Sequence, residues 1–550
     1  MSHFPAILSV INLYKQDVTQ TDNFPRITRD DFFNLNVGDS IEFPDSRNHK
    51  NQIVLKIPQF DAIASNFPFI QQEDIPNEIL TAFFREKFEA RQQAFLKDNT
   101  FKINERSDYF TYCVYNAIRF LKVGGFLAAI TSNAWLGKEY GFQFKKFLLD
   151  NFHIKYIVKS NAEHWFSNSK VSTIYTVLQK GVSHEATKFV TLNFKLDERF
   201  TQENVNRQLA QIEDFYTAID HCADSHNWRK DDTFNDLYRN EQDKMDVCIV
   251  PKQKLLESIE SKDNWAKYFV SAYLFESFDK YLTQLYPRVI DVFRGERTGW
   301  NRMFVIPKRN VNTSGIEDSF LVPYLKSTRE LRKIEFDGNY NFRLFVCQTP
   351  FEQTPNGAKQ WIKRFENAQN TNDTLTIQQT CSGHRPYWYS LRPKQAHIVT
   401  PINPFERFFF SFSQTPFTID QRLIAMTVKD GYDVELIAAL LNSAITFLTL
   451  EMRGTPRNLG ALDLNASYLK KLRILNPDLL SSHQKEDILT AFQPLKKRAI
   501  ETIFVETQKP DRINFDKTIL RSFGINENLL DSIYALLTSS VFDRVSMHDR

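Results

Sequence analysis

An asparagine, a proline and an aromatic ring follow a short apolar run, in the order Ser65-Asn66-Phe67-Pro68-Phe69. The apolar run over 60–64 is typical of a buried strand. An asparagine side-chain oxygen accepts N–H groups, and an aromatic ring stacks on a planar partner. Proline stiffens the turn and fixes where a backbone carbonyl points. Taken alone, the same order of residue types also fits an ordinary turn after a strand.

The stretch resembles the catalytic tetrapeptide of DNA amino-methyltransferases, in which Asn or Asp precedes Pro, Pro and an aromatic residue. The resemblance implies a site for an exocyclic amine such as adenine N6, whose lone pair is delocalised into the ring. Asn66 and a carbonyl near Pro68 would accept its two N–H groups, and Phe69 would stack on a base flipped out of the duplex. The methyl donor is already activated, so no metal is expected. The chain departs from the family at Phe67, where a proline is usual.

Patterns downstream predict the elements that position this stretch. Apolar residues at helical spacing over 110–121 predict a helix that ends at Gly124-Gly125, and 126–131 is typical of a buried strand. A helix over 139–150 and strands over 154–158 and 171–178 follow. This alternation predicts an α/β fold with a partial Rossmann-like, doubly wound sheet.

The order of motifs over about 25–180 is similar to that of gamma-class adenine-N6 DNA methyltransferases of restriction–modification type, in type IIG and type I-like proteins. There a strand leads into a Ser-Asn-X-Trp-Leu segment, and a Phe precedes a strand that opens with Ser/Thr-Ile. This chain has Ser132-Asn133-Ala134-Trp135-Leu136, then Phe166 and Ser172-Thr173-Ile174. A helix N-cap at Asn133 and a core aromatic at Trp135 are the alternative.

A second resemblance, over about 290–475, is to the target-recognition domains of restriction–modification proteins. It rests on Phe293 to Asn301, on Arg385-Pro386-Tyr387-Trp388-Tyr389 and on Ile437 to Ser443. Residues 294–334 hold nine Lys or Arg against four acidic residues, an excess that suits DNA phosphates. A solvated face with buried aromatics is the alternative. The candidate DNA-binding residues are Arg294, Arg297, Thr298, Trp300, Asn301, Arg329, Arg332, Arg385, Tyr387, Trp388 and Arg392.

The cofactor site that the family implies is incomplete in the sequence. S-adenosylmethionine is bound beside a glycine-rich turn, yet no Gly-x-Gly occurs, and Gly38 is the one glycine before Asn66. Asp30 and Asp31 end a short strand expected over 25–33 and resemble the family's acidic residue near the cofactor adenine. We therefore expect a split enzyme in which a second subunit carries most of the S-adenosylmethionine site. A catalytically inactive DNA-recognition subunit and a truncated product are the alternatives.

Length and composition set the remaining expectations. The 550 residues suggest three or four domains. Five widely spaced cysteines fit a reducing cytoplasm and argue against a zinc cluster. With no apolar run long enough to span a membrane, a cytoplasmic protein is expected. No nuclease site is expected in the sequence.

The expected organisation has four parts. They are the C-terminal half of a methyltransferase domain over 1–180, a helical connector over 181–286, a mixed α+β target-recognition domain over 287–480 and C-terminal helices over 481–550. The expected activity is adenine-N6 methylation of a specific double-stranded DNA sequence in restriction–modification or phage defence.

Overall fold

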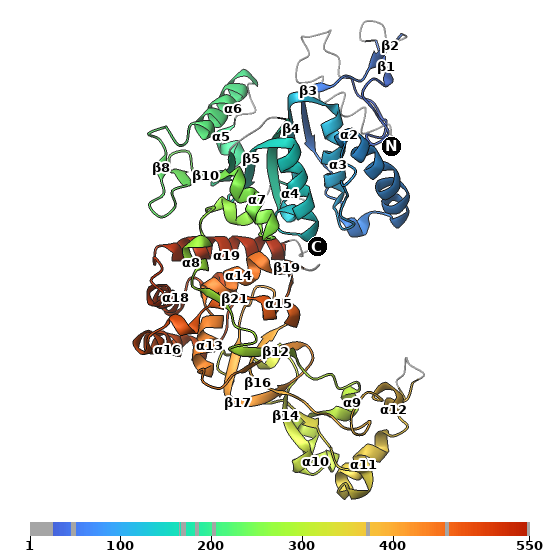
Figure 1. Cartoon of the computed structure of the whole chain (residues 1–550), viewed down its shortest axis with the longest axis vertical. Coiled ribbons are helices and arrows are strands. Elements are labelled where there is room, and N and C mark those ends of the chain that lie inside the picture. The colour runs from blue at the N-terminus through green and yellow to red at the C-terminus, as the bar shows by residue number, and fades with distance from the viewer. Residues whose placement is uncertain are drawn as a thin grey trace. The chain divides into compact units, whose positions relative to one another are not determined.

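The computed structural model describes residues 26–45, 51–163, 165–166, 172–181, 186–200, 205–369, 375–456 and 461–546. Contacts divide the chain into two units, Met1–Ala272 and Tyr273–Arg550, and each contains a large sheet (Figure 1). The four-part division therefore stays a prediction.

An eight-stranded sheet is the centre of the first unit, in the order β3-β4-β6-β5-β7-β10-β9-β8. Strand β3 is parallel to β4 and β5 is parallel to β7, whereas β6 is antiparallel to both β4 and β5. The predicted α/β class is confirmed. The strands are β3 Phe60–Asn66, β4 Leu121–Ser132, β5 Phe152–Ser160, β6 Thr173–Lys180, β7 Ala186–Leu192, β8 Arg229–Lys230, β9 Leu237–Asn240 and β10 Met245–Pro251.

Helices pack against this sheet, among them α2 Glu89–Leu96, α3 Tyr109–Ala117, α4 Glu139–Asn151 and α7 Lys252–Glu260. The predicted helix over 139–150 is confirmed as α4. Trp135 is buried between Phe144 and Trp265, so the alternative of a core aromatic at this position was correct. Ser132, not Asn133, caps the short turn Asn133–Leu136, because its side chain accepts the Ala134 N–H.

Three local predictions are wrong. The helix over 110–121 ends near Phe120, and Gly124-Gly125 lies inside β4. The expected strand over 25–33 is absent from its described part, residues 26–33, where Asp31 accepts the Phe33 N–H and turns the chain. The expected helical connector over 181–286 contributes β7 to β10 to the sheet as well as helices, including α5 Leu196–Arg199 and α6 Val205–Asp220.

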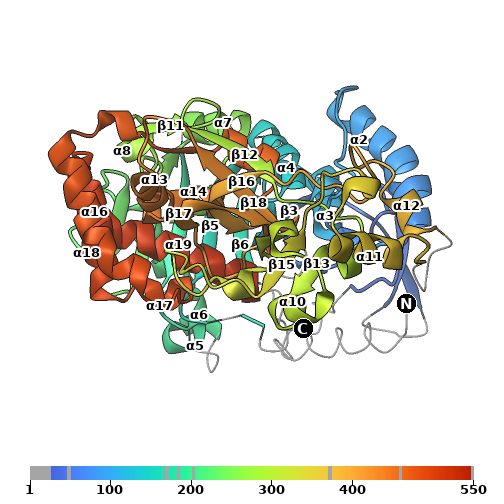
Figure 2. The ribbon, with the colours of Figure 1, turned by 90° about the horizontal axis from the view of Figure 1, so that it is seen from below.

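The second unit contains a seven-stranded sheet in the order β12-β18-β16-β17-β14-β15-β13. In Figure 2, α16 Ser482–Lys497 and α18 Pro510–Ser522 lie side by side, and the helices predicted over 481–550 also include α19 Leu529–Ser546. The strands are β12 Ile290–Arg294, β13 Val305–Pro307, β14 Leu321–Leu325, β15 Phe342–Phe345, β16 Gln395–Pro401, β17 Ser411–Ile419 and β18 Leu423–Val428.

Asn442 explains one of the sequence landmarks structurally. It is fully buried after α13 Val434–Leu441, and its side chain exchanges hydrogen bonds of 3.0 and 2.9 Å with the backbone of Phe410. Arg512 donates to the Asn442 carbonyl at 2.7 Å and pairs with Asp516 at 2.8 Å. The Leu-Asn-Ser landmark thus ties α13 to the sheet and to α18.

No single helix in the described ranges is long and apolar enough to cross a membrane. Helix α13 and α14 Ala444–Arg453, bent by 56° at their junction, meet the length and composition criteria only as a pair.

Candidate active site and nucleic-acid interface

Asn66 ends β3, the outermost strand of the first unit's sheet. It pairs in register with Ile130 of β4, and its side chain is exposed. The next residue, Phe67, donates its N–H to the Ile130 carbonyl at 3.3 Å. The chain therefore leaves the sheet directly after Asn66, and this places the amide at the carboxyl end of a parallel strand pair.

Phe67 is buried, with 7% of its surface exposed, while Pro68 on its other side is exposed. Phe67, which stands where the family usually has a proline, therefore anchors the loop through its buried ring. Phe69 is half-buried, and its ring meets Phe166 edge to face with centroids 5.5 Å apart. An amide, a proline and an aromatic pair thus gather at one end of β3.

The far end of the loop is held by α3. The Tyr109 N–H donates to the Ile70 carbonyl at 3.0 Å, and Asp108 accepts the Gln72 N–H at 3.2 Å. Asp108 also accepts the Tyr140 hydroxyl of α4 at 2.6 Å. Anchored at Ile130, Tyr109 and Asp108, the loop has a fixed path, as a positioning site requires.

Replacing Phe67 tests the anchoring. We expect Phe67→Ala to lower the free energy of unfolding by about 3–5 kcal/mol, because a buried ring is lost. Phe67→Pro, which restores the family residue, should also destabilise, since proline lacks the N–H that bonds to Ile130. Denaturant unfolding measures both. Phe126→Ala is the control, because Phe126 is 38% exposed; an equal loss there would contradict the anchoring role.

Asp108 predicts a pH dependence. Burial raises the pKa of its carboxyl, although Lys138 and the bond from Tyr140 oppose this. Below the unperturbed pKa of about 4, the contribution of Asp108 to the free energy of unfolding is fully present. It is lost as the pH rises through the raised pKa. We expect Asp108→Asn to gain stability relative to the native chain as the pH rises, measured by unfolding at several pH values. Asp74→Asn, at an exposed position, should show no such pH-dependent gain. If the difference in the free energy of unfolding between Asp108→Asn and the native chain does not change with pH, the prediction is contradicted.

The predicted cofactor residues lie in a turn next to an aromatic cluster. Asp30 is exposed and contacts the Thr28 hydroxyl, while Asp31 closes the turn at Phe33. Phe33 packs on Tyr109, whose own N–H holds the Asn66 loop. The described residues beside β3 include no glycine-rich cradle, so by themselves they do not fit a complete S-adenosylmethionine site.

In the second unit, residues 294–296 pair with the turn between β17 and β18. The Glu296 N–H donates to the Ile419 carbonyl at 2.7 Å, and the Gln421 N–H donates to the Glu296 carbonyl at 3.0 Å. A Cβ on Gly295 would lie 2.1 Å from the Asp420 carbonyl oxygen, so only glycine allows this approach. The landmark beginning at Phe293 therefore joins two segments more than a hundred residues apart.

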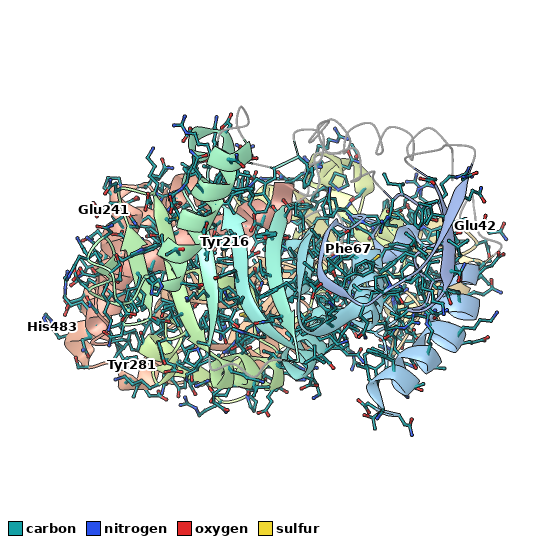
Figure 3. All side chains as sticks on the ribbon, turned by 90° about the horizontal axis from the view of Figure 1, so that it is seen from above. Glu42, Phe67, Tyr216, Glu241, Tyr281 and His483 are labelled. Atoms are coloured by element: carbon teal, nitrogen blue, oxygen red, sulfur yellow. The ribbon has the colours of Figure 1, made fainter. Side chains whose placement is uncertain are left out.

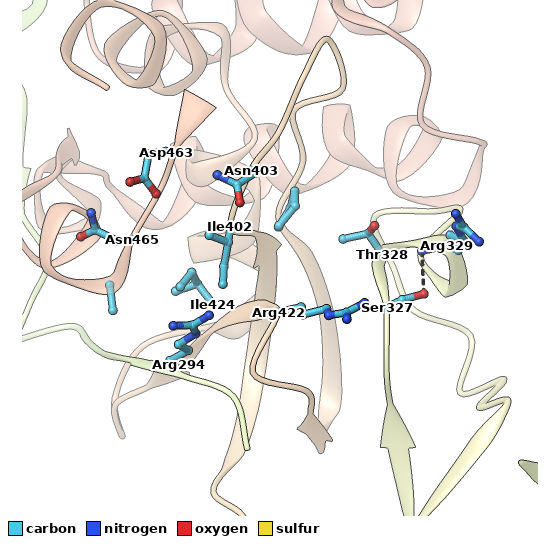
Figure 4. A pocket seen from close by; sticks show the side chains of 12 residues that line it. Arg294, Ser327, Thr328, Arg329, Ile402, Asn403, Arg422, Ile424, Asp463 and Asn465 are labelled. Carbon is cyan, nitrogen blue, oxygen red and sulfur yellow. Dashed lines mark hydrogen bonds between the residues drawn. The ribbon is translucent and has the colours of Figure 1, made fainter. Parts of the chain in front are cut away.

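This junction borders a polar cavity of about 810 Å³. Arg294, Arg329 and Arg422 line it, and Figure 4 shows Arg422 extending toward the Ser327–Arg329 turn. Arg294 donates to the Gln421 carbonyl at 2.6 Å. Within the described ranges, the guanidinium groups of Arg329 and Arg422 have no hydrogen bond or ion pair. Two unpaired cations in one hollow suit an anionic partner such as a phosphate.

Asn301, Arg329 and Arg422 line an adjoining cavity of about 350 Å³. The structure therefore brings together three of the predicted DNA-binding residues, Arg294, Asn301 and Arg329. Arg297 and Arg332 are exposed but line neither cavity.

Other predicted residues have structural roles. Trp300 and Thr298 are only 8% and 4% exposed, so the prediction that they contact DNA is corrected: they belong to the interior. Tyr387 stacks on Tyr389 with centroids 5.1 Å apart, and Trp388 packs on the same core. Two arginines are exposed but held by local bonds: Arg385 donates to the carbonyls of Ser382 and His384, and Arg392 to Gln348.

Sequence reasoning missed several residues of the larger cavity, namely Arg422, Asn403, Asp463 and Asn465. It also gave Phe166 no role in the site, although Phe166 meets Phe69. Arg422 carries no signal of its own in the sequence, because only the pairing of 294–296 with 419–421 brings it to the basic segment.

Comparison with known proteins gives a family match. Residues 8–166 match the Eco57I restriction-modification methylase family. The chain is 19% identical over 449 residues to the Type II methyltransferase M.BstVI of Geobacillus stearothermophilus, covering 78% of this chain and 70% of that relative.

Two solved structures are similar at 12% identity. The type IIG restriction endonuclease BpuSI has a TM-score of 0.44 and matches 96% of this chain. The type IIL restriction-modification enzyme MmeI, solved in complex with DNA, has a TM-score of 0.41 and matches 87% of this chain. The chain spans 57% of the length of each of these proteins.

The family match extends across the Asn66 loop and the Asn133 segment and ends at Phe166. These are the motifs on which the predicted resemblance to restriction–modification methyltransferases rests, and that resemblance is confirmed over this segment. The matched model describes a restriction-modification methylase, and the relative is a Type II methyltransferase. Residues 8–166 are thus similar to the Eco57I restriction-modification methylase family.

Proposed function

We propose that this chain is the catalytic and DNA-recognition component of a site-specific DNA adenine-N6 methyltransferase of restriction–modification or phage defence. In this proposal a second polypeptide supplies most of the S-adenosylmethionine site. The observation that carries the proposal is the exposed Asn66 amide at the end of β3, next to the Phe69–Phe166 ring pair.

The residues of the loop suit an adenine amine. The Asn66 side-chain oxygen and a carbonyl in the loop accept its two N–H groups, and Phe69 stacks on the flipped base. Two acceptors orient the nitrogen and raise its electron density toward the donor. The cofactor, when bound, supplies an activated methyl group. The chain's own residues hold and orient the amine.

The free edge of β3 supports a second polypeptide. β3 pairs only with β4 among the described strands, and its side chains are largely exposed, with Phe60 at 41%. Parallel strands are normally covered on both faces, and an open edge presents unpaired N–H and C=O groups. A strand of the cofactor-binding component would pair with this edge and place the methyl donor beside Asn66.

The DNA-recognition part of the proposal rests on the second unit. The unpaired Arg329 and Arg422 and the neighbouring Arg294 make the larger cavity cationic. Asn403 and Asn465 add amide groups. The Asn403 amide donates to the Leu462 carbonyl and the Asn465 oxygen accepts the Tyr468 N–H, so the Asn403 oxygen and the Asn465 amide nitrogen remain for base edges. The larger cavity would thus provide both phosphate contacts and base contacts.

Co-expression tests this function. The chain is produced alone and with candidate partners that carry a glycine-rich cofactor motif, in a host free of adenine methylation. We expect N6-methyladenine at one sequence motif only when both chains are present. Methylation by the chain alone would contradict partner dependence, and a product other than N6-methyladenine would contradict the assigned substrate.

The alternative function is a DNA-recognition subunit without catalysis, and Phe67 in place of proline favours it. It predicts specific DNA binding but no methylation with any partner that binds β3.

A further inference from the structure

A further cavity, in the first unit, adjoins the Asn66 loop and has no role in the function proposed above. It measures about 500 Å³ and is bounded by the carboxyl ends of β4 and β5, the start of β6, and helices α5 and α6. Its lining includes the aromatic residues Trp165, Phe166, Tyr175, Phe200, Phe215 and Tyr216.

The cavity and the Asn66 loop share a wall. Ile130 lines the cavity and is also the register partner of Asn66. Phe166 lines it as well, and its ring meets that of Phe69. In Figure 3, Tyr216 and Phe67 lie toward the same end of the strands. Asn66, Pro68 and Phe69 are not part of the lining, so the cavity is next to the amine site and separate from it.

The polar groups of the cavity are few. The Trp165 indole N–H is buried and has no hydrogen-bond partner within the described part of the chain. The Tyr175 and Tyr216 hydroxyls bond to each other at 2.8 Å, and burial raises the pKa of both, so they stay uncharged near neutral pH. Gln208 and Asp197 add an amide and a carboxylate.

This combination suits one chemical class. Flat aromatic walls stack on a planar ring, and a lone indole donor with a few acceptors matches the heteroatoms on the edge of a nitrogen heterocycle. An aliphatic ligand would leave the Trp165 N–H unsatisfied, at a cost in free energy. An anion would meet Asp197 and no cation among the lining residues.

We propose that this cavity binds a second nucleobase of the DNA strand, one that neighbours the methylated adenine. The inference rests on the proposed methylation of DNA and deepens it. Helix α6, which sequence reasoning left without a role, becomes a wall of the DNA site. Holding a flanking base would unstack the strand on one side of the target and make the sequence at that position matter for binding.

The test measures binding, so it does not depend on catalysis. The complex of the chain with its partner is mixed with duplexes that carry the bound sequence, recovered by selection of bound DNA fragments. Each flanking position is replaced in turn by an abasic site. Gln208→Trp, on the half-buried side of α6, fills the cavity, and Leu209→Trp, on its exposed side, is the matched control.

We expect an abasic site at one flanking position to weaken binding of the native complex about tenfold, the scale of one base–aromatic stack. Gln208→Trp should weaken binding to intact DNA to the same extent and cause no further loss with that abasic duplex, because the two changes remove one interaction. Leu209→Trp should match the native complex. If the loss of affinity caused by Gln208→Trp adds to the loss caused by the abasic site at every flanking position, the proposal is overturned.

Trp165→Phe keeps an aromatic ring of smaller area and removes the indole donor, so it serves if Gln208→Trp fails to fold. We expect a smaller loss of affinity, coupled to the same flanking position. A free nucleotide is the other source of this chemistry. If Gln208→Trp abolishes binding of adenosine monophosphate but does not change the affinities for the abasic duplexes, a DNA base is not the ligand. Absence of methylation together with normal coupling would contradict the proposed catalysis, and only the binding of one DNA base in this cavity would remain supported.

Discussion

Asn66→Ala is expected to lower adenine methylation by about 10²–10³-fold, the usual effect of removing one positioned hydrogen-bonding group from an active site. The amide is exposed at the end of β3 and makes no packing contribution that its loss would disturb. Binding of DNA and the free energy of unfolding should therefore change little. The measurement is N6-methyladenine in the genome of a host that expresses the chain with its partner.

Two further variants make this test specific. Asn66→Asp keeps an acceptor that the family itself uses and should retain part of the activity. Asn99→Ala removes an exposed amide elsewhere in the same unit and should change nothing. Methylation that survives Asn66→Ala would contradict the assignment of Asn66, and a parallel loss in Asn99→Ala would point to a general defect.

The sequence predicted the elements whose determinants are local. Helix α4 and strands β3 to β6 follow from apolar spacing within each segment, and the Asn66 loop follows directly from the strand before it. The wrong boundary near 121 has a distant cause. Lys180 of β6 donates to the carbonyls of Ile118 and Leu121 at 2.8 and 2.7 Å. These bonds satisfy backbone carbonyls where the helix ends, and the apolar pattern over 110–121 does not reveal them.

Burial distinguishes the predicted DNA-binding residues that are accessible from those that belong to the core, for a similar reason. An aromatic residue next to arginines fits both DNA contact and a core, and Trp300 packs with Phe304 and Tyr389 in the core of the second unit. β7 and β10 were missed because charged residues surround them. Their pairing with each other, antiparallel from Met245 and Leu192 onward, depends on segments more than fifty residues apart.

The double variant Arg329→Ala/Arg422→Ala is expected to weaken DNA binding by about tenfold for each arginine. Both guanidinium groups line the larger cavity of the second unit and have no partner in its described ranges. Truncation therefore breaks no bond within the protein, and the free energy of unfolding should stay within about 0.5 kcal/mol of the native value. Fluorescence anisotropy at several salt concentrations is the measurement.

The salt dependence shows what each arginine binds. If both bind phosphates, the slope of log affinity against log salt should become shallower by about two, nearly one for each arginine removed, with no change in sequence preference. If one reads a guanine edge, discrimination at one base pair should fall by about 1–3 kcal/mol with little change in slope. Arg309→Ala, in the same basic segment but outside both cavities, removes one positive charge, as each of the two arginine substitutions does. An equal loss from Arg309→Ala would mean that net charge, and not this cavity, binds the DNA.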